Sequence, residues 1–391
     1  MLRLLHTADV HLGARHADLG EAAAAQRERQ FAAFVATIDL ALVETVDIVL
    51  IAGDLFDSNL QPKRTVERAA AEIARLAGAR IRTVIIPGTH DVYDRSSVYR
   101  AFDIAGLAGN PQGGDLVTVL SPERADVHLA ACDAVVYGRV FSTKRAPHSP
   151  LLDFSAAADS RATWKIGLLH AAVAIPGKTD RDEVVITREE IAASGLDYLA
   201  LGHWHSAQKD RAGSVQYAYS GAPEPVAVDQ DRAGKVLLVE LDERDRKRTV
   251  TIEERQVGRT RWEKVQIDAG TLKGQPALVD HLRKRADPDL VLDVSLSGVR
   301  PDELDLDTDE VEAALKPQFL RVRVRDRSVP ALTTGAIPSA DTIAGAFIRD
   351  LEGRIAELEA GAGVTAADQA RELRDSLRLG RLLLAGHEVT L

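Results

Sequence analysis

Short apolar runs alternate with segments of helical spacing over the first 255 residues of the chain. The clearest run, Ile48–Ile51, is rich in β-branched residues and leads into a turn at Gly53–Asp54. Such a run is typical of a parallel strand that is buried on both faces. Residues 21–46 and 63–77 instead place apolar side chains at three- and four-residue steps, as amphipathic helices do. The repeated strand, loop and helix units predict an α/β domain over residues 1–255.

The pattern changes after residue 255 to shorter apolar runs and highly charged helical segments. Strands and helices alternate over residues 256–328, which predicts a second, smaller domain of the order βαβαβ. Pro330 and Pro338 then indicate a linker. Residues 329–391 are predicted to hold this linker and two amphipathic helices. Their apolar stripes would pack on their own domain or on a partner helix.

The composition argues against a disulfide-linked or membrane-spanning protein. The chain has 391 residues, a formal net charge of −10 and one cysteine, Cys132, so an internal disulfide is excluded. The first apolar segment is interrupted by Asp9 and His11, which argues against a signal peptide or a membrane span. We therefore expect a cytoplasmic protein. The acidic balance argues against nucleic-acid binding by bulk electrostatics but leaves room for local positive charge or for bound metal ions.

Polar side chains with metal-binding groups follow several of the predicted strands. A single histidine after a strand is usually an ordinary polar residue, but a DxH pair, a GDxxD turn and a GHxH pair occur here in order, each behind its own apolar run. Carboxylates and imidazoles at one sheet edge suit manganese, iron or zinc better than calcium. They could hold two ions about 3.5–4 Å apart. The residues concerned are Asp9, His11, Asp54, His90, His170, His203 and His205.

The motifs and their order resemble those of the calcineurin-like metallophosphoesterase superfamily. Ala8–Gly13, which reads ADVHLG, and Gly53–Asp57, which reads GDLFD, are most similar to the SbcD-type DNA repair exonucleases of that superfamily. The resemblance covers the predicted first domain with specific motifs and extends more weakly to the rest of the chain. It implies a four-layer α/β/β/α sandwich, a small α/β capping domain and a C-terminal helical tail.

The resemblance also implies a role for each residue of the site. One divalent ion would bind Asp9, His11 and His205, the other would bind His170 and His203, and Asp54 would bridge them, with manganese as the expected metal. His90 would be the catalytic histidine, which orients the phosphate or protonates the leaving oxygen. We expect Asp57 and Asp91 to orient imidazoles instead of binding metal, because a metal-bound histidine usually donates its other N–H to such a group.

One position departs from the family pattern. The family motif is GNHD, in which the Asn gives an amide oxygen to the second metal, whereas this chain reads Gly88-Thr89-His90-Asp91. A threonine hydroxyl is a shorter and poorer ligand for a hard cation. If Thr89 lies at the metal, the second site is more loosely bound, selective for another metal, or weakened in an enzyme kept for DNA binding. The other ligand positions are intact, which favours an active enzyme.

The predicted function is a metal-dependent DNA phosphodiesterase, an exonuclease and endonuclease in DNA repair that acts with an SMC-like ATPase of the SbcC type. Arg95, Tyr99 and Arg100 could approach a DNA backbone, although solvated charge is the stronger explanation for each of them. The C-terminal helices would provide the docking segment for the ATPase, and a homodimer is compatible with this plan. Two alternatives stay open: a DNA-binding or scaffold subunit with weakened catalysis, and a small-molecule phosphoesterase.

Overall fold

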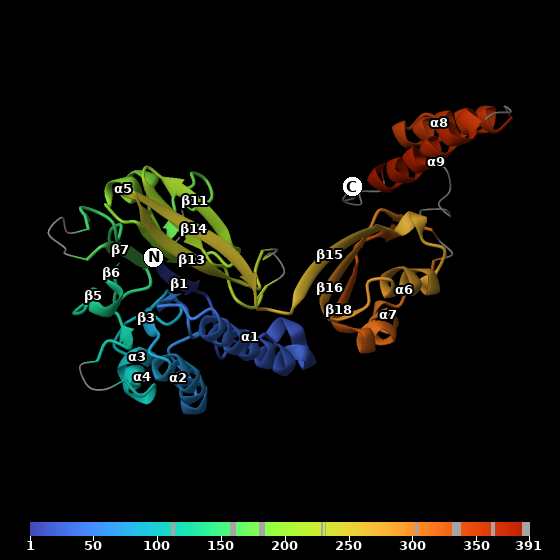
Figure 1. Cartoon of the computed structure of the whole chain (residues 1–391). Helices are drawn as coiled ribbons and strands as arrows, with labels where there is room; N and C mark the ends of the chain where they lie inside the picture. The colour runs from blue at the N-terminus through green and yellow to red at the C-terminus, as the bar shows by residue number, and fades with distance from the viewer. Residues whose placement is uncertain are drawn as a thin grey trace. The chain divides into compact units, whose positions relative to one another are not determined.

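A computed structural model describes residues 1–110, 114–156, 162–179, 184–227, 230, 232–301, 304–330, 338–360 and 364–384 (Figure 1). The chain divides into two compact units, Met1–Arg261 and Trp262–Leu391. The further division at residue 328 stays a prediction, and residues 331–337 of the predicted linker lie outside the described residues. Of the helices that the structure describes, none is long and apolar enough to cross a membrane.

The first sheet of unit one has six strands in the order β14-β13-β1-β2-β3-β4. Its strands β1 to β4 are parallel, and β13 and β14 form an antiparallel hairpin beside β1. The apolar run at Val236–Glu240 predicts a strand from the sequence, and it forms the first half of the longer β13. The bounds are β1 (Leu2–Thr7), β2 (Ile48–Ala52), β3 (Arg82–Ile86), β4 (Val117–Val119), β13 (Lys235–Arg244) and β14 (Lys247–Gln256).

The second sheet has six strands in the order β11-β12-β10-β7-β6-β5. Its central strands β12, β10, β7 and β6 are parallel, and the register pairs Gly202 with His170 at the carboxyl end. Two chain segments that are far apart in sequence therefore end side by side. The bounds are β5 (Asp126–Leu129), β6 (Ala134–Gly138), β7 (Trp164–His170), β10 (Tyr198–Gly202), β11 (Gln208–Ala212) and β12 (Val215–Tyr219).

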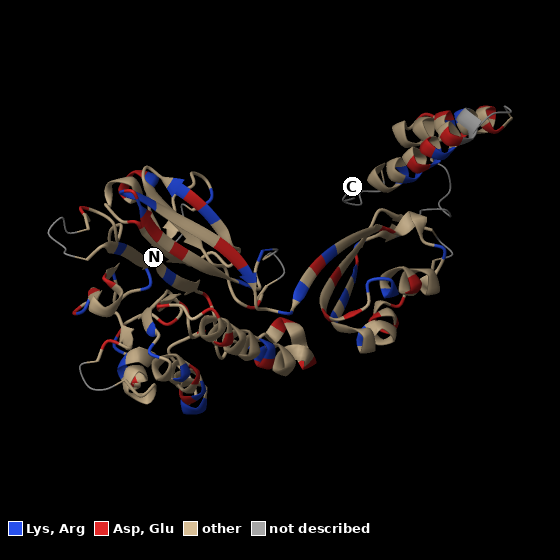
Figure 2. Cartoon of the chain, in the orientation of Figure 1, with Lys and Arg blue, Asp and Glu red and all other residues tan. Residues whose placement is uncertain are grey.

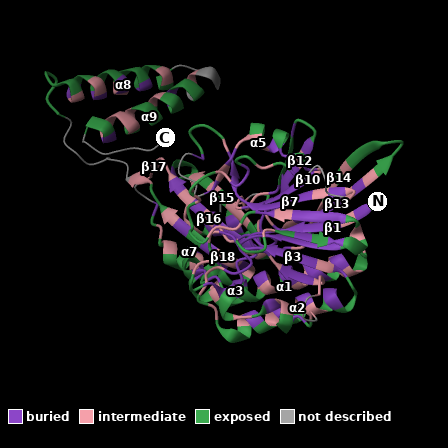
Figure 3. Ribbon diagram, turned by 90° about the vertical axis from the view of Figure 1, so that its left-hand side faces the viewer, coloured by how far each residue is buried: buried purple, intermediate pink, exposed green. Residues whose placement is uncertain are grey.

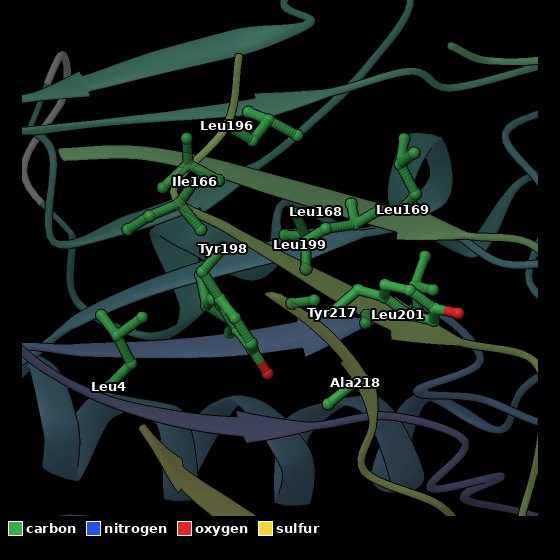
Figure 4. Packing of buried hydrophobic residues seen from close by; sticks show 14 of the residues in the cluster. Leu4, Ile166, Leu168, Leu169, Leu196, Tyr198, Leu199, Leu201, Tyr217 and Ala218 are labelled. Atoms are coloured by element: carbon green, nitrogen blue, oxygen red, sulfur yellow. The ribbon is translucent and has the colours of Figure 1, made fainter. Parts of the chain in front are cut away.

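The two sheets pack face to face, and helices cover the outer face of the first sheet. Alternate residues of one strand point to opposite faces, so Leu4 lies in the core between the sheets, while Leu5 lies under the helices. Figure 4 shows Leu4 opposite Tyr198 and Ile166 of the second sheet. On the other face, helix α1 (Ala23–Val43) and helix α2 (Lys63–Gly78) contribute Phe34 and Ile73. Figure 3 shows these strands as mostly buried.

Short elements complete unit one. Helix α5 (Arg188–Ala193) begins with a capping box in which the Thr187 hydroxyl and the Glu190 carboxylate each accept a backbone N–H of the other residue. The others are η1 (Ala17–Ala22), α3 (Val98–Ala101), α4 (Ile104–Leu107), η2 (Ala130–Cys132), β8 (Ala172–Val173) and β9 (Val185–Ile186).

Unit two holds a three-stranded sheet in the order β15-β16-β18, and two helices pack on it. Leu278 and Leu315 of these helices share a core with Leu292 and Val322 of the strands. The predicted α/β class, with its small second α/β part and C-terminal helices, is confirmed. The bounds are β15 (Arg261–Asp268), η3 (Ala269–Thr271), α6 (Gln275–Arg283), β16 (Asp287–Ser297), β17 (Val299–Arg300), α7 (Thr308–Leu315), η4 (Lys316–Gln318), β18 (Phe319–Asp326), β19 (Val329–Pro330), α8 (Ile343–Ala360) and α9 (Val364–Leu384).

Candidate metal centre

The predicted ligands gather where parallel strands of both sheets end. Asp9 follows β1, Asp54 follows β2 and His90 follows β3 in the first sheet, while His170 ends β7 and His203 follows β10 in the second. The carboxyl edge of a parallel sheet is the usual place for chemistry in an α/β protein. Because the two sheets are stacked, their edges bring residues from both halves of unit one to the same place.

The backbone at this edge adopts unusual conformations. Asp9, His11, Asp54 and His203 have φ angles of 53°, 51°, 50° and 103°, in the region that favours glycine. Each such residue costs about 1–3 kcal/mol, and such residues cluster at functional sites, where the surrounding structure holds them. These conformations occur where the chain turns directly after strands β1, β2 and β10.

Asp9, His11 and His205 form the first cluster that could hold a metal ion. His11 Nε2 lies 3.1 Å from His205 Nε2, and His205 Nε2 lies 3.8 Å from Asp9 Oδ1. On the other side of its ring, His11 Nδ1 lies 3.3 Å from Asp57 Oδ1. That contact places the His11 proton on Nδ1 and leaves the lone pair of Nε2 directed into the cluster.

Asp54 joins this cluster to a second one. Its Oδ2 lies 3.2 Å from His170 Nε2 and 4.0 Å from His11 Nε2, while its Oδ1 accepts the backbone N–H of His90 at 2.7 Å. The turn at Gly88 passes so close that a Cβ there would lie 2.2 Å from Asp54 Oδ1. Only glycine at position 88 leaves space for the Asp54 carboxylate. The Oδ2 atom of this carboxylate lies between the imidazoles of His11 and His170.

The second cluster contains Asp9, Asp54 and His170, and it fits a cation. His170 Nδ1 donates to the carbonyl oxygen of Ala52 at 2.9 Å, so its Nε2 carries a lone pair in the neutral ring. That Nε2 is buried and has no hydrogen-bond partner among the described residues, although a carboxylate oxygen faces it. Two acceptors that face each other need a positive charge between them, which a proton on His170, or a divalent ion in its place, would provide.

His203 and Thr89 complete the set of predicted residues. The backbone N–H of His203 donates to both oxygens of Asp9 at 3.1 Å, which fixes that carboxylate, and the His203 ring lies 5.4 Å from the His170 ring. Thr89 is half-buried on the turn between Gly88 and His90. The two clusters thus contain Asp9, His11, Asp54, His170 and His205. The ring of His203 lies beside His170, and Thr89 is placed only by its position between Gly88 and His90.

The pKa shifts show a buried centre that needs positive charge. Burial raises the pKa of Asp9 to about 6, an effect that the charge of His170 opposes. Burial also acts to raise the pKa of Asp54, but the positive charges of His170 and His11 outweigh it, so the net pKa is lowered. Burial lowers and the carboxylate of Asp54 raises the pKa of His170, with a net value of about 10. In His205, burial and the charge of His11 lower the pKa to about 3.

The two aspartates expected to orient imidazoles differ. Asp57 makes the predicted contact, since its carboxylate lies 3.3 Å from His11 Nδ1. The prediction for Asp91 is wrong. Its carboxylate accepts the backbone N–H groups of Gly88 at 2.7 Å and Phe56 at 3.1 Å and the hydroxyl of Tyr99 at 2.6 Å. Asp91 therefore ties together the two turns that carry Asp54 and His90.

This contact also corrects the prediction for Tyr99, which is 9% exposed and so is not available to a DNA backbone. Arg100, by contrast, is exposed and lies over the ring of Tyr93 at 4.3 Å. Tyr99 and Arg100 are adjacent in sequence but differ in exposure. Tyr99 is buried because its hydroxyl donates to the buried carboxylate of Asp91, and within the described ranges of the chain Arg100 has no such contact with a buried carboxylate.

Gln230 is a site residue that sequence reasoning missed. Its Oε1 accepts the backbone N–H of Val226 at 2.8 Å and that of Ala227 at 3.2 Å, and its amide nitrogen contacts His205 Nδ1. The backbone carbonyl of His205 in turn accepts the N–H of Ala222 at 2.9 Å. Gln230 lies outside every motif and every apolar run, so only the structure could identify it.

Two stacked sheets with His and Asp clusters at their shared edge define an α/β metallophosphoesterase. The chain belongs to the calcineurin-like phosphoesterase family, whose model matches residues 2–207. This confirms the predicted superfamily.

Relatives share part of the chain. The DNA double-strand break repair protein Mre11 of Aeropyrum pernix is 30% identical over 253 residues, which are 62% of this chain and 58% of that protein. The alignment thus spans less than two thirds of that relative. The metallophosphoesterase YhaO of Bacillus subtilis is 26% identical over 329 residues, 78% of this chain and 73% of that protein. A dimetal phosphatase structure from Danio rerio aligns with a TM-score of 0.41 and 12% identity, over 66% of this chain and 96% of that one.

Proposed function

We propose that the chain is a metal-dependent DNA phosphodiesterase of the SbcD type, with exonuclease and endonuclease activity. The observation that carries this proposal is the position of Asp54 Oδ2 between His170 and His11, because it provides one carboxylate oxygen for two neighbouring cation sites. The similarity to a DNA double-strand break repair protein over 253 residues supports DNA as the substrate.

The residues divide between two ions. Asp9, His11 and His205 would hold one, His170 and His203 the other, and Asp54 would be shared. Bound divalent ions would stabilise the charge on the attacking and leaving oxygens in an in-line displacement at phosphorus. Thr89 would border the second ion.

His90 is placed to hold or deliver a proton. Its side chain is 48% exposed, and its ring lies perpendicular to that of His11 with 4.7 Å between the centroids. Its Nδ1 donates to the carbonyl oxygen of Asp57 at 3.0 Å, which leaves Nε2 as the ring atom that can exchange a proton with the leaving oxygen. The same ring can orient a phosphate oxygen that enters beside His11.

The partner proposal rests on the second unit. A small-molecule phosphoesterase needs neither the sheet of β15, β16 and β18 nor the paired helices α8 and α9, whereas a DNA enzyme that works with an SMC-like ATPase of the SbcC type could use both. Figure 2 shows Lys and Arg interspersed with Asp and Glu along the strands and helices, so DNA would be held by local contacts and by metal ions.

The test is cleavage of linear double-stranded DNA with Mn²⁺, with bis(p-nitrophenyl) phosphate assayed in parallel. The wild type should cut DNA, and His90→Ala should not. His128→Ala, which removes a histidine that is 67% exposed on β5, is the matched control and should cut normally. Turnover of the small diester without DNA cleavage would point to a small-molecule phosphoesterase. DNA cleavage that appears only in Thr89→Asn would point to a scaffold subunit whose second metal site is weakened.

A further inference from the structure

A cavity of about 470 Å³ lies next to the metal centre and has no assigned role. His203 and His205 form the wall that it shares with the centre, and Trp204, between them in sequence, forms another. Lys178 and Arg232 lie on the rest of its lining. The cavity therefore combines access to the metal centre with an aromatic surface and two cations.

Stacked side chains place the ammonium group of Lys178 there. The hydroxyl of Tyr219 is fixed because it donates to the carbonyl of Ala171 at 3.0 Å and accepts the N–H of Val173 at 2.8 Å. The Trp204 ring stacks on Tyr219 with 4.9 Å between centroids and 16° between planes. Lys178 Nζ lies 4.9 Å from the centroid of Trp204, within the range of a cation–π contact.

The backbone of Lys178 is held as well. The Thr179 hydroxyl, 3% exposed, accepts the N–H of Ile175 at 2.9 Å and donates to the carbonyl of Ile175 at 3.1 Å. The N–H of Lys178 donates to the same carbonyl at 3.0 Å. The lysine therefore projects from a turn whose backbone is closed by hydrogen bonds.

The two cations differ in their availability. Arg232 already pairs with Glu254 at 2.9 Å. For Lys178, the described part of the chain provides the Trp204 ring as a neighbour but no carboxylate in ion-pair distance. As far as the described residues go, an anion that enters the cavity would thus meet Lys178 without first breaking an ion pair.

We propose that this cavity is a subsite for the nucleotide phosphate next to the scissile one, with Lys178 as its cation and Trp204 as its wall. The inference rests on the proposed DNA phosphodiesterase function. A nucleic acid strand whose scissile phosphate lies at the Asp54 carboxylate carries a second negative charge one nucleotide away. A small diester has no such charge, so the subsite favours polynucleotides over small substrates.

The experiment measures cleavage of a fluorescein-labelled single-stranded oligonucleotide with Mn²⁺, over salt concentrations from about 50 to 200 mM. Lys178→Gln should raise KM for the oligonucleotide about tenfold, the value expected for one lost charge-assisted contact. The slope of log(kcat/KM) against log[salt] should become shallower by about 0.7, the contribution of one phosphate contact in a single strand. Lys178→Arg keeps the charge and should keep the slope.

Lys247→Gln is the matched control, because it removes the same charge at the opposite edge of the first sheet. In the strand register, Lys247 of β14 lies opposite Arg244 of β13. This position is beyond Leu241, which lies opposite Leu2 at the amino end of β1, whereas the metal centre is at the carboxyl end. An unchanged KM and salt slope in Lys178→Gln would overturn the subsite, and so would an equal change in Lys247→Gln. A wild type that hydrolyses bis(p-nitrophenyl) phosphate but no oligonucleotide would instead overturn the proposed function, and the subsite with it.

Discussion

Asp91 offers a test of how the turns that carry Asp54 and His90 are held. In the wild type its two carboxylate oxygens accept three hydrogen bonds, from the backbone of Gly88, the backbone of Phe56 and the hydroxyl of Tyr99. Asp91→Asn keeps the shape of the side chain but replaces one oxygen with an NH₂ group. Because both backbone neighbours are donors, the amide must face one of them with another donor.

The expected loss of stability follows from this count. Whichever way the amide turns, one buried backbone N–H loses its acceptor, which costs about 1–3 kcal/mol. The remaining bonds lose the strength that the charge gave them, and burying a neutral group instead of a carboxylate offsets part of that loss. We expect Asp91→Asn to lower the free energy of unfolding of unit one by about 2–3 kcal/mol. Tyr99→Phe, which removes one bond and strands no N–H, should cost about 1–1.5 kcal/mol.

Urea unfolding provides the measurement. A Trp262→Phe background leaves Trp164 and Trp204 as fluorescent reporters, both in unit one. EDTA in all samples separates the contribution of the hydrogen bonds from that of bound metal. A loss below about 0.5 kcal/mol for Asp91→Asn, the range of an ordinary surface substitution, would refute the role of Asp91 as the link between the two turns.

Three further predictions concern the metal centre and the core beneath it. Gly88→Ala would place a Cβ 2.2 Å from Asp54 Oδ1 and should lower phosphodiesterase kcat about 100-fold, as expected when a ligand is displaced by about 1 Å; wild-type kcat would contradict the close approach. Mn²⁺ at about 100 times its Kd should stabilise the folded chain by about 2.7 kcal/mol, seen as a Tm increase that EDTA reverses and that His11→Ala reduces; equal increases in both proteins would place the ion elsewhere. Burial lowers the pKa of His6 to about 3 in the folded chain, compared with 6.5 in the unfolded chain. Between these two pH values mainly the unfolded chain binds a proton at His6. The folded chain therefore has its full stability above pH 6.5 and loses stability as the pH falls. Relative to His6→Gln, wild-type stability should decrease by about 1.4 kcal/mol per pH unit between pH 6 and 4, and parallel pH curves would show that His6 is accessible to water.

The strands and the residues that follow them could be predicted because an apolar run and the turn after it both lie within one short segment of sequence. The run Ile48–Ile51 and the turn at Gly53–Asp54 lie in one short segment, and the structure places Asp54 at the end of β2 as expected. The antiparallel hairpin of β13 and β14 was only partly predicted. Strand β14 is exposed along much of its length and carries charged residues toward both ends, so it has no apolar run that would identify it.

The contacts between side chains of the site depend on how the two sheets stack. A pattern of apolar and polar residues within one segment does not predict that stacking. Apolar runs before Asp54 and His170 predict two strand ends, but the 3.2 Å contact of these side chains requires the two sheets to pack face to face. That packing was implied only by the family resemblance. The prediction for Asp91 is wrong because it follows the general rule that a metal-bound histidine donates its other N–H to a carboxylate, whereas the tight turn directs this carboxylate to backbone N–H groups. Gln230 comes from a loop without periodicity.

The central claim is that Asp54 joins two metal sites at the shared edge of the sheets. Titration of the apo protein with Mn²⁺, followed by calorimetry and by the electron paramagnetic resonance of coupled Mn²⁺ pairs, tests it most directly. We predict two equivalents with a spin-coupled signal in the wild type, one equivalent in His170→Ala, and tighter binding of the second equivalent in Thr89→Asn. A single uncoupled ion in the wild type, or binding that is unchanged in Asp54→Asn, would contradict the account.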